Sequence, residues 1–78
     1  MYTEILKHRL REMRLLKGYT QENIAKDLNV SQGTYNNWET GRRIPELQTI
    51  LKIADYYNIE LDYLFGRDVE MNEKLKNS

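Results

Sequence analysis

The sequence has 78 residues, and its 12 basic and 12 acidic side chains give a formal net charge of zero. A chain of this length builds one small hydrophobic core, so we expect a single domain. It contains no cysteine, which excludes disulfides and thiolate chemistry and is typical of a reducing compartment. No run approaches the roughly 18 apolar residues of a membrane-spanning helix, and no secretory signal peptide is evident. We therefore expect a soluble cytoplasmic protein.

The charges are unevenly distributed along the chain. Residues 7–43 carry eight basic and four acidic side chains, a balance of +4, whereas residues 44–78 carry four basic and seven acidic ones, a balance of −3. Residues 1–6 add one negative charge. Such asymmetry can orient a protein on a polyanion even when its total charge is zero. An ordinary mixed surface gives the same pattern, so charge alone leaves both interpretations open.

The chain opens with a segment of helical periodicity. We expect an amphipathic helix over residues 3–17, with Thr3 as its N-cap and Gly18 at its end. Tyr19 then packs back over this helix. The inward stripe recurs at spacings of four, three and four residues and consists of Leu6, Leu10, Met13 and Lys17.

Two shorter helices follow, joined by a tight turn. Thr20 precedes the first, over residues 21–28, and Ser31 precedes the second, over residues 32–40. A hydroxyl at such a position accepts a hydrogen bond from an unpaired first-turn amide. Gly41 supplies the left-handed conformation that ends the second helix. Helices this short are unstable alone in water, so both must pack against the rest of the domain.

The two faces of the second short helix differ in chemistry. Its inward face carries Tyr35 and Trp38, and the inward face of the preceding helix carries Ile24, Ala25 and Leu28. Its outward face is polar and uncharged, and amide side chains of this kind suit hydrogen bonding to base edges in DNA. Simple solvation is the alternative, which the residues alone leave open. The outward residues are Gln32, Gly33, Asn36, Asn37 and Thr40.

A basic loop leads into the next helix. Arg42 and Arg43 follow the end of the second short helix, where positive charge suits the helix dipole and where both could contact phosphate. Pro45 fixes the backbone before a helix over residues 47–57, for which Glu46 is a weak N-cap. The expected inner face of this helix consists of Leu47, Ile50, Ile53, Ala54 and Tyr57.

The C-terminal part of the chain holds one further short helix. Asn58 ends the preceding helix, and Ile59 is expected to be buried. The last helix covers residues 61–65 and closes at Gly66. Residues 67–78 are polar with only a weak apolar pattern, which predicts a frayed tail or a short extra helix. We thus divide the chain into a folded domain over residues 1–66 and this tail.

Two charged residues lie beside apolar stripes rather than opposite them. These are Arg14 on the first helix and Glu39 on the second short helix. We expect them to form a partly buried ion pair that ties the first helix to the two-helix motif. Two independent, solvated charges are the alternative.

Aromatic residues concentrate near the C-terminal end. Tyr56, Tyr63 and Phe65 exceed what a small core requires. They either cover the edge of the core or form a patch for self-association. We favour self-association and take Tyr63 as its best single candidate.

The composition gives no support for an enzyme. His8 is the only histidine, and without cysteine or a second histidine a metal site would need carboxylates alone, none of which are suitably spaced. The chain also lacks a Ser/His/Asp set and a glycine-rich phosphate loop. We expect no catalysis, no metal and no cofactor.

Two segments, TQENIAKDLNVSQGTYNNWETGRRIP and LQTILKIADYYNIELDYLFG, resemble the lambda-repressor/Cro-like helix-turn-helix family of the xenobiotic-response-element type. The resemblance covers about residues 5–66. It implies an all-α, compact five-helix domain that binds double-stranded DNA as a transcriptional regulator, usually as a homodimer on an inverted repeat. The residues in register are Gln21, Ala25, Val30, Ser31, Glu39, Gly41, Pro45 and the Leu-Asp-x-Leu run at residues 61–64.

The resemblance also implies roles for individual residues. Gln21 would contact a phosphate and brace Gln32, the first side chain to enter the major groove. Asn36 and Asn37 would be further base contacts, with Asn37 the stronger. The resemblance places Arg14 and Glu39 as a helix-bridging pair. Contacts to the DNA backbone would come from Thr40, Arg42 and Arg43.

Some residues depart from the family pattern. Gly33 occupies a position where many members carry a base-reading side chain, so direct readout is expected to be thinner. Asn29 replaces the usual glycine in the turn, where asparagine tolerates the left-handed conformation. Glu46 and Glu60 replace the usual serine caps, which bears on stability more than on function.

Two functions follow from this resemblance. The first is a sequence-specific DNA-binding regulator, expected to be a repressor of bacterial, phage or mobile-element origin that uses the helix over residues 31–40. The second is an antitoxin or anti-regulator whose main partner is another protein. In that case the acidic C-terminal half and residues 67–78 would be the active surface.

Overall fold

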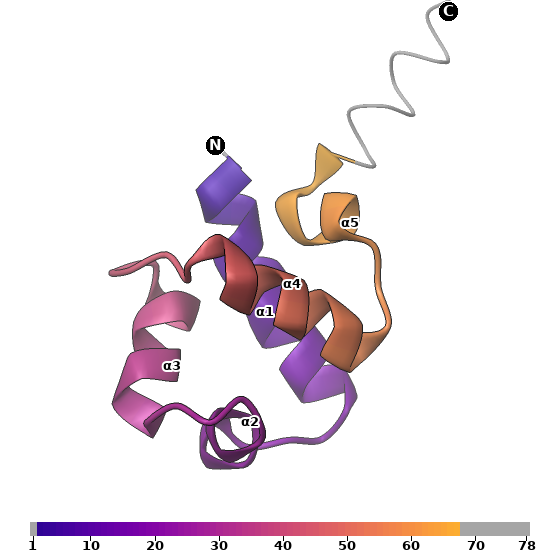
Figure 1. Ribbon diagram of the computed structural model, residues 1–78. Coiled ribbons are helices and arrows are strands. Elements are labelled where there is room, and N and C mark those ends of the chain that lie inside the picture. Colours follow the sequence, from indigo (N-terminus) through magenta and orange to yellow (C-terminus); the bar gives the residue numbers. More distant parts are fainter. Residues whose placement is uncertain (1, 68–78) are drawn as a thin grey trace, which may run out of the picture.

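The computed structural model describes residues 2–67, which form five α-helices (Figure 1). No β-strand occurs between residues 2 and 67, so the expected all-α, five-helix fold is confirmed. The tail expected over residues 67–78 lies outside the described residues except for Arg67. The helices are α1 (Tyr2–Leu16), α2 (Gln21–Asp27), α3 (Gln32–Thr40), α4 (Leu47–Tyr57) and α5 (Leu61–Phe65).

The two short helices begin where the hydroxyl caps predict. Thr20 Oγ1 accepts a hydrogen bond from the Asn23 amide at 3.0 Å, and Asn23 Oδ1 accepts one from the Thr20 amide at 3.1 Å. Ser31 Oγ accepts from the Thr34 amide at 3.1 Å. These bonds satisfy first-turn amides that have no partner within their own helix. Both caps are therefore confirmed.

The bounds of α1 differ from the expectation at both ends. The helix begins at Tyr2, so Thr3 lies inside it and is not an N-cap. Neither proline nor glycine occurs at the start of the helix, so the helical conformation extends back beyond Thr3. It ends at Leu16, which leaves Lys17 exposed and outside the inward stripe. The physical reason is Gly18, whose positive φ of 72° turns the chain and lets the Tyr19 amide bond back to the Arg14 carbonyl.

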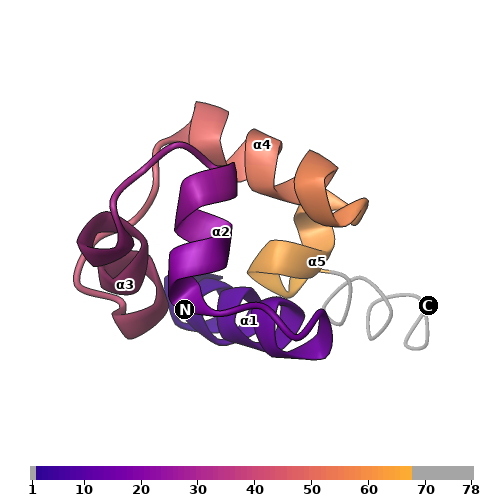
Figure 2. The same cartoon turned by 90° about the horizontal axis from the view of Figure 1, so that it is seen from below.

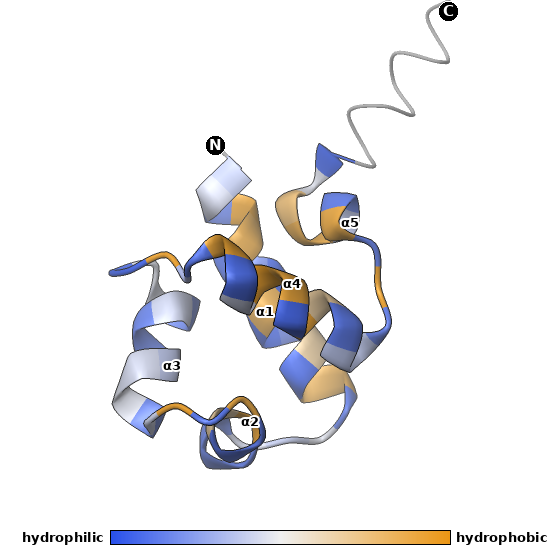
Figure 3. Ribbon diagram, in the orientation of Figure 1, coloured by the Kyte–Doolittle hydropathy of each residue, from blue (hydrophilic) through white to orange (hydrophobic). Residues whose placement is uncertain are grey.

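All five helices contribute to one core. The hydropathy colouring shows apolar residues on the sides of α1, α4 and α5 that face one another (Figure 3). The most deeply buried side chains include Leu10 of α1, Ile24 of α2 and Leu64 of α5, each fully shielded from solvent. Burying one such side chain contributes about 1.5–3 kcal/mol. The rest of the core consists of Leu6, Met13, Ala25, Leu28, Tyr35, Trp38, Ile50, Ile53, Ala54 and Tyr57.

Two apolar residues lie nearer to solvent than expected. Leu47 is 64% exposed, because the first turn of α4 extends past the edge of the core, where Pro45 is the buried residue instead. Ile59 is half-buried and packs against the side of the core, so it is not the buried plug that its position suggested. The predictions for both residues were wrong.

The helices place two surfaces at opposite ends of the molecule. Figures 1 and 2, which are views at right angles, both show α3 on one side and α5 on the other, with α1 and α4 between them. The outer face of α3 is therefore accessible without displacing α5. None of the helices between residues 2 and 67 has the length and apolar character needed to cross a bilayer.

A bidentate ion pair links α1 to α3. Arg14 Nε donates to Glu39 Oε2 at 2.6 Å, and Arg14 Nη2 donates to Glu39 Oε1 at 3.1 Å. Only 12% of the Arg14 side chain and 4% of the Glu39 side chain are exposed. Arg14 Nη1 also donates to the Tyr19 carbonyl at 2.9 Å, which holds the α1–α2 connection. One guanidinium thus ties together α1, α3 and the segment between α1 and α2.

Burial and pairing act in opposite directions on Glu39. Desolvation opposes its ionisation, but the hydrogen bonds and the charge of Arg14 outweigh this effect, so the Glu39 pKa is lowered from 4.5. Because the folded-state pKa lies below the unfolded one, the pair stabilises the fold fully above about pH 4.5. This contribution is lost as the pH falls through the folded-state pKa.

The first prediction concerns two glycines with positive φ. Gly18→Ala should cost about 1–2 kcal/mol of unfolding free energy, since a β-carbon there meets nothing within 4 Å and only backbone strain remains. Gly66→Ala should cost about 1–3 kcal/mol more, because its β-carbon would lie 2.7 Å from Ile5 Cδ1. Urea unfolding measures both. Adding Ile5→Ala should recover part of the Gly66→Ala loss, and equal costs for the two glycines would contradict this account.

The second prediction concerns the buried pair. Glu39→Gln should lower the unfolding free energy at pH 7 by about 3–5 kcal/mol, because it leaves the Arg14 guanidinium buried without a counter-charge. Glu12→Gln is the matched control, since its side chain is 62% exposed and its carboxylate lies 3.9 Å from Arg9 Nε, so its loss should cost less than about 1 kcal/mol. The gap between wild type and Glu39→Gln should narrow below about pH 4.5 as Glu39 becomes protonated. Equal effects of the two variants at pH 7 would exclude a structural role for the pair.

Candidate nucleic-acid interface

The outer face of α3 presents polar side chains to solvent. Gln32, Gly33 and Thr40 are exposed, as expected for the outward face of this helix. Asn36 and Asn37 were also expected to project freely, but both are half-buried. Apart from Thr40 at its C-terminal end, the exposed residues of this face therefore lie in the N-terminal turn of α3.

Asn36 is drawn against α2 by a specific hydrogen bond. Gln21 Nε2 donates to Asn36 Oδ1 at 3.0 Å and to Glu39 Oε1 at 3.4 Å. The side chain of Gln21 therefore braces α3 at its middle and C-terminal half, whereas the family resemblance implied that it would brace Gln32. Since Arg14 holds the same carboxylate of Glu39, Gln21 and Asn36 join the network that ties α1 to α3.

The C-terminal end of α3 meets the basic loop. Gly41 ends the helix at a φ of 80°, and the Arg43 amide then donates to the Asn37 carbonyl at 3.1 Å. Arg42 and Arg43 are both exposed. The hydroxyl of Thr40 donates to the Asn36 carbonyl at 3.0 Å, so it must rotate before it can donate to a phosphate.

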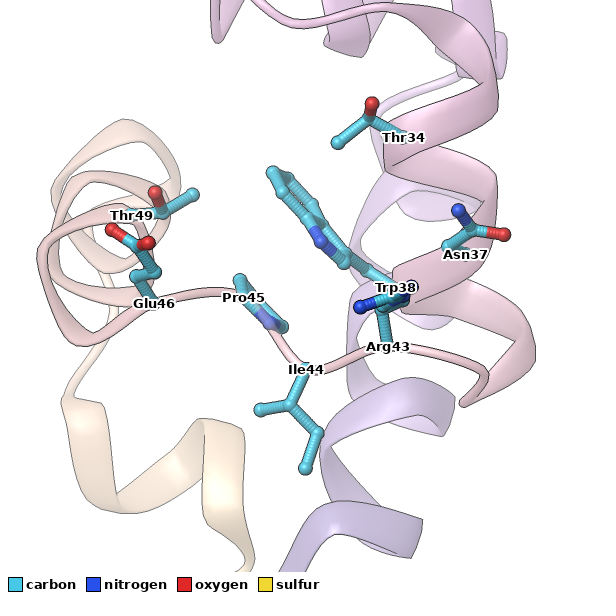
Figure 4. A pocket seen from close by; sticks show the side chains of 8 residues that line it. All are labelled: Thr34, Asn37, Trp38, Arg43, Ile44, Pro45, Glu46 and Thr49. Carbon is cyan, nitrogen blue, oxygen red and sulfur yellow. The ribbon is translucent and has the colours of Figure 1, made fainter.

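A surface pocket of about 330 Å³ lies between α3 and the start of α4 (Figure 4). The ring of Trp38 projects into the space between these helices, while the amide of Asn37 points away from that ring (Figure 4). Asn37 is thus half-buried at the edge of the pocket with its amide group directed outward. The lining residues are Thr34, Asn37, Trp38, Arg43, Ile44, Pro45, Glu46 and Thr49.

The sequence reasoning overlooked Thr34. This residue is exposed in the first turn of α3, two positions after Gln32, and its hydroxyl accepts a hydrogen bond from the Ser31 hydroxyl at 2.8 Å. Its place directly after Gly33 in a polar first turn could have identified it. Thr34 and Ser31 therefore extend the hydrogen-bonding surface around Gln32.

Tyr56, expected at a self-association surface, has partners within its own chain. Its hydroxyl donates to Asp27 Oδ2 at 2.6 Å, and its ring packs edge-on against Tyr19 and Tyr57. Lys52 donates to the Leu28 carbonyl at 3.3 Å, so two side chains of α4 hold the C-terminal end of α2. Tyr56 thus has a structural function whether or not it also meets a second copy.

The aromatic residues of α5 also pack on the core. The guanidinium of Arg9 lies 4.0 Å from the ring centroid of Tyr63, and Arg9 Nη1 donates to the Tyr63 carbonyl at 3.1 Å. Phe65 and Tyr63 are half-buried against the core. Within one chain, Tyr63 and Phe65 therefore cover the edge of the core, which is the alternative that the sequence left open.

Within residues 2–67, no three acidic, histidine or cysteine side chains come together in a way that could hold a metal ion. The chemistry of this surface is hydrogen bonding by amides and hydroxyls, flanked by arginines.

Comparison with known sequences agrees with this geometry. A sequence model described as "Helix-turn-helix" matches residues 10–64, more than half of the chain. The HTH-type transcriptional regulator ImmR of Bacillus subtilis is 41% identical over 66 residues, which are 85% of this chain and 51% of ImmR. The uncharacterized HTH-type transcriptional regulator YazB of the same species is 44% identical over 64 residues, 82% of this chain and 93% of YazB.

A phage protein is also similar. The cryptic phage CTXphi transcriptional repressor RstR of Vibrio cholerae is 30% identical over 70 residues, 88% of this chain and 63% of RstR. The chain thus spans about half of ImmR and somewhat less than two thirds of RstR. No solved structure matches the chain significantly. From the helical geometry, the family match and these relatives together, the chain belongs to the Cro/C1-type helix-turn-helix family of DNA-binding transcriptional regulators.

Proposed function

We propose that this protein is a repressor that reads an inverted-repeat operator as a homodimer, with the N-terminal turn of α3 in the major groove. The observation that carries the proposal is the exposed side chain of Gln32 on a helix whose orientation is fixed by Arg14, Gln21 and Glu39. A helix-turn-helix protein contacts base edges with the N-terminal residues of its second helix. The repressor assignment is supported by the similarity to RstR, which is named a transcriptional repressor.

We assign the residues that face the DNA to two roles, base contacts and backbone contacts. Gln32 pairs its amide with adenine N6 and N7, and Asn37 makes the second base contact, because its amide points away from the core. Asn36 contributes least to base reading, since its amide oxygen already accepts a bond from Gln21. Contacts to the DNA backbone position the helix without specifying sequence, and we assign them to Gln21, Thr40, Arg42 and Arg43. Gln21 must release one of the bonds that its amide nitrogen donates to Asn36 and Glu39 before that nitrogen can donate to a phosphate.

The homodimer follows from the few contacts that one copy can make. Each protomer offers a short reading surface and two exposed arginines, so one half-site gives weak binding. We propose that the two copies meet through the end of the molecule that carries Tyr56, Tyr63 and Phe65. Because α5 and α3 lie at opposite ends, such a contact leaves both reading helices free (Figure 2).

The third prediction tests base reading. Sites are selected from a random DNA pool, and affinities are then measured for a selected site and for unrelated DNA. Gln32→Ala and Asn37→Ala should each weaken specific binding by about 1–3 kcal/mol per protomer, roughly 5- to 150-fold per half-site, with little loss on unrelated DNA. Gln48→Ala is the matched control, because this exposed glutamine lies on α4. If specific and non-specific binding fell equally, base reading by these residues would be rejected.

The fourth prediction tests the dimer. The selected sites should contain two inverted half-sites whose centres lie about one helical turn, roughly 34–36 Å, apart. Inserting about five base pairs between them rotates one half-site by half a turn and should abolish tight binding. Sedimentation of the protein–DNA complex should give two copies per site. Tight binding of one copy to an isolated half-site would refute the dimer.

A further inference from the structure

The first helix brings a third cation to the basic end of α3. A β-carbon added at Gly41 would lie 3.0 Å from Lys7 Cδ and 3.6 Å from Lys7 Nζ, so the lysine side chain lies directly over Gly41. Arg42 and Arg43 follow Gly41 in the chain and are exposed. Helix α1 and the loop after α3, more than 30 residues apart in sequence, therefore both supply positive charges near Gly41. This is the surface that we propose contacts the DNA backbone.

Packing restricts Lys7 in a way that an ordinary surface lysine is not restricted. Only 25% of its side chain is exposed, because its stem lies against the chain at Gly41. Its ammonium group is near the C-terminal end of α3, where the helix dipole favours a cation. A cation positioned before DNA arrives loses less side-chain entropy on binding than a free one.

In the free protein this charge already has a partner. Lys7 Nζ lies 3.1 Å from Oε2 of Glu4, which is one turn earlier on α1. The hydrogen bond and charge of Lys7 lower the Glu4 pKa, so Glu4 is ionised at neutral pH. The Glu4 side chain is 67% exposed, and a pair open to solvent in this way is weak. The closely spaced phosphates of a DNA duplex present a higher density of negative charge than one exposed carboxylate and can therefore displace it.

We propose that Lys7 is a further contact to the DNA backbone, and that it exchanges the Glu4 carboxylate for a phosphodiester oxygen when α3 enters the groove. The inference rests on the proposed mode of DNA binding. It adds α1 to the elements that hold the duplex. It also gives Glu4 a role as an internal competitor that weakens binding until a phosphate occupies its place. The structural alternative is that Lys7 only packs on the end of α3.

The fifth prediction uses the salt dependence of binding to a selected site. Each phosphate contact contributes about 0.9 to the slope of log affinity against log salt concentration. Lys7→Gln should therefore reduce the slope by about 0.9 per protomer and weaken binding roughly five- to tenfold per protomer at 0.1 M salt. Lys7→Arg should restore both. Lys17→Gln is the matched control, because it removes the same charge at a position about 15 Å from Lys7 along the axis of α1.

The competitor role is tested by removing the acid. Glu4→Gln should raise the affinity severalfold above the gain from Glu12→Gln, which removes the same charge elsewhere on α1. The additional gain should vanish in the Lys7→Gln background. A gain that persists without Lys7, or equal slopes for Lys7→Gln and Lys17→Gln, would overturn the inference.

Two further readouts separate the possible failures. Thermal unfolding monitored by circular dichroism shows whether Lys7→Gln remains folded, and if it does not, the comparison of Glu4→Gln with Glu12→Gln decides alone. If the wild-type protein bound no DNA selectively, the proposed function itself would fail. If it bound selectively while the Lys7 and Glu4 variants behaved like their controls, only the present inference would fail.

Discussion

The carboxylate of Glu39 is almost completely buried, and the rest of the fold is arranged so that it is satisfied. Arg14 approaches it from α1 with two nitrogens, and Gln21 approaches it from α2 with its amide. An ionised group in this position destabilises the fold unless such partners are in place. The angles between α1, α2 and α3 are consequently constrained by directional bonds in addition to the apolar core.

This constraint matters because DNA recognition depends on orientation. A bidentate amide–adenine pair requires its side chain to be positioned closely, and a helix free to roll would spread Gln32 over many poses. The same network holds Asn36 toward α2, which in the proposed binding mode leaves base contacts to the first turn of α3 and to Asn37. At the other end of α3, Lys7 of α1 lies over Gly41, and the two exposed arginines of the loop follow Gly41 in the chain. In the proposed binding mode, the N-terminal end of α3 contacts bases and its C-terminal end meets the phosphates.

Local signals predicted much of the fold and some of the candidate site. Hydroxyl caps at Thr20 and Ser31 and a left-handed glycine at Gly41 act through atoms close in sequence, so their positions could be recognised from the residues alone. The exposure of Leu47 could not be predicted in this way, because helical periodicity gives the face of a residue but not where the core ends.

Sequence by itself therefore determined the all-α class, the two-helix motif, the polar face of α3 and the family. Only the tertiary structure decided that Gln21 braces Asn36 and Glu39, and that Lys7 lies over Gly41 beside the arginine loop. The reason is physical: caps and periodicity arise from bonds within a few residues, whereas these contacts join segments 15 to 34 residues apart. Their geometry exists only after the core has fixed how the helices cross.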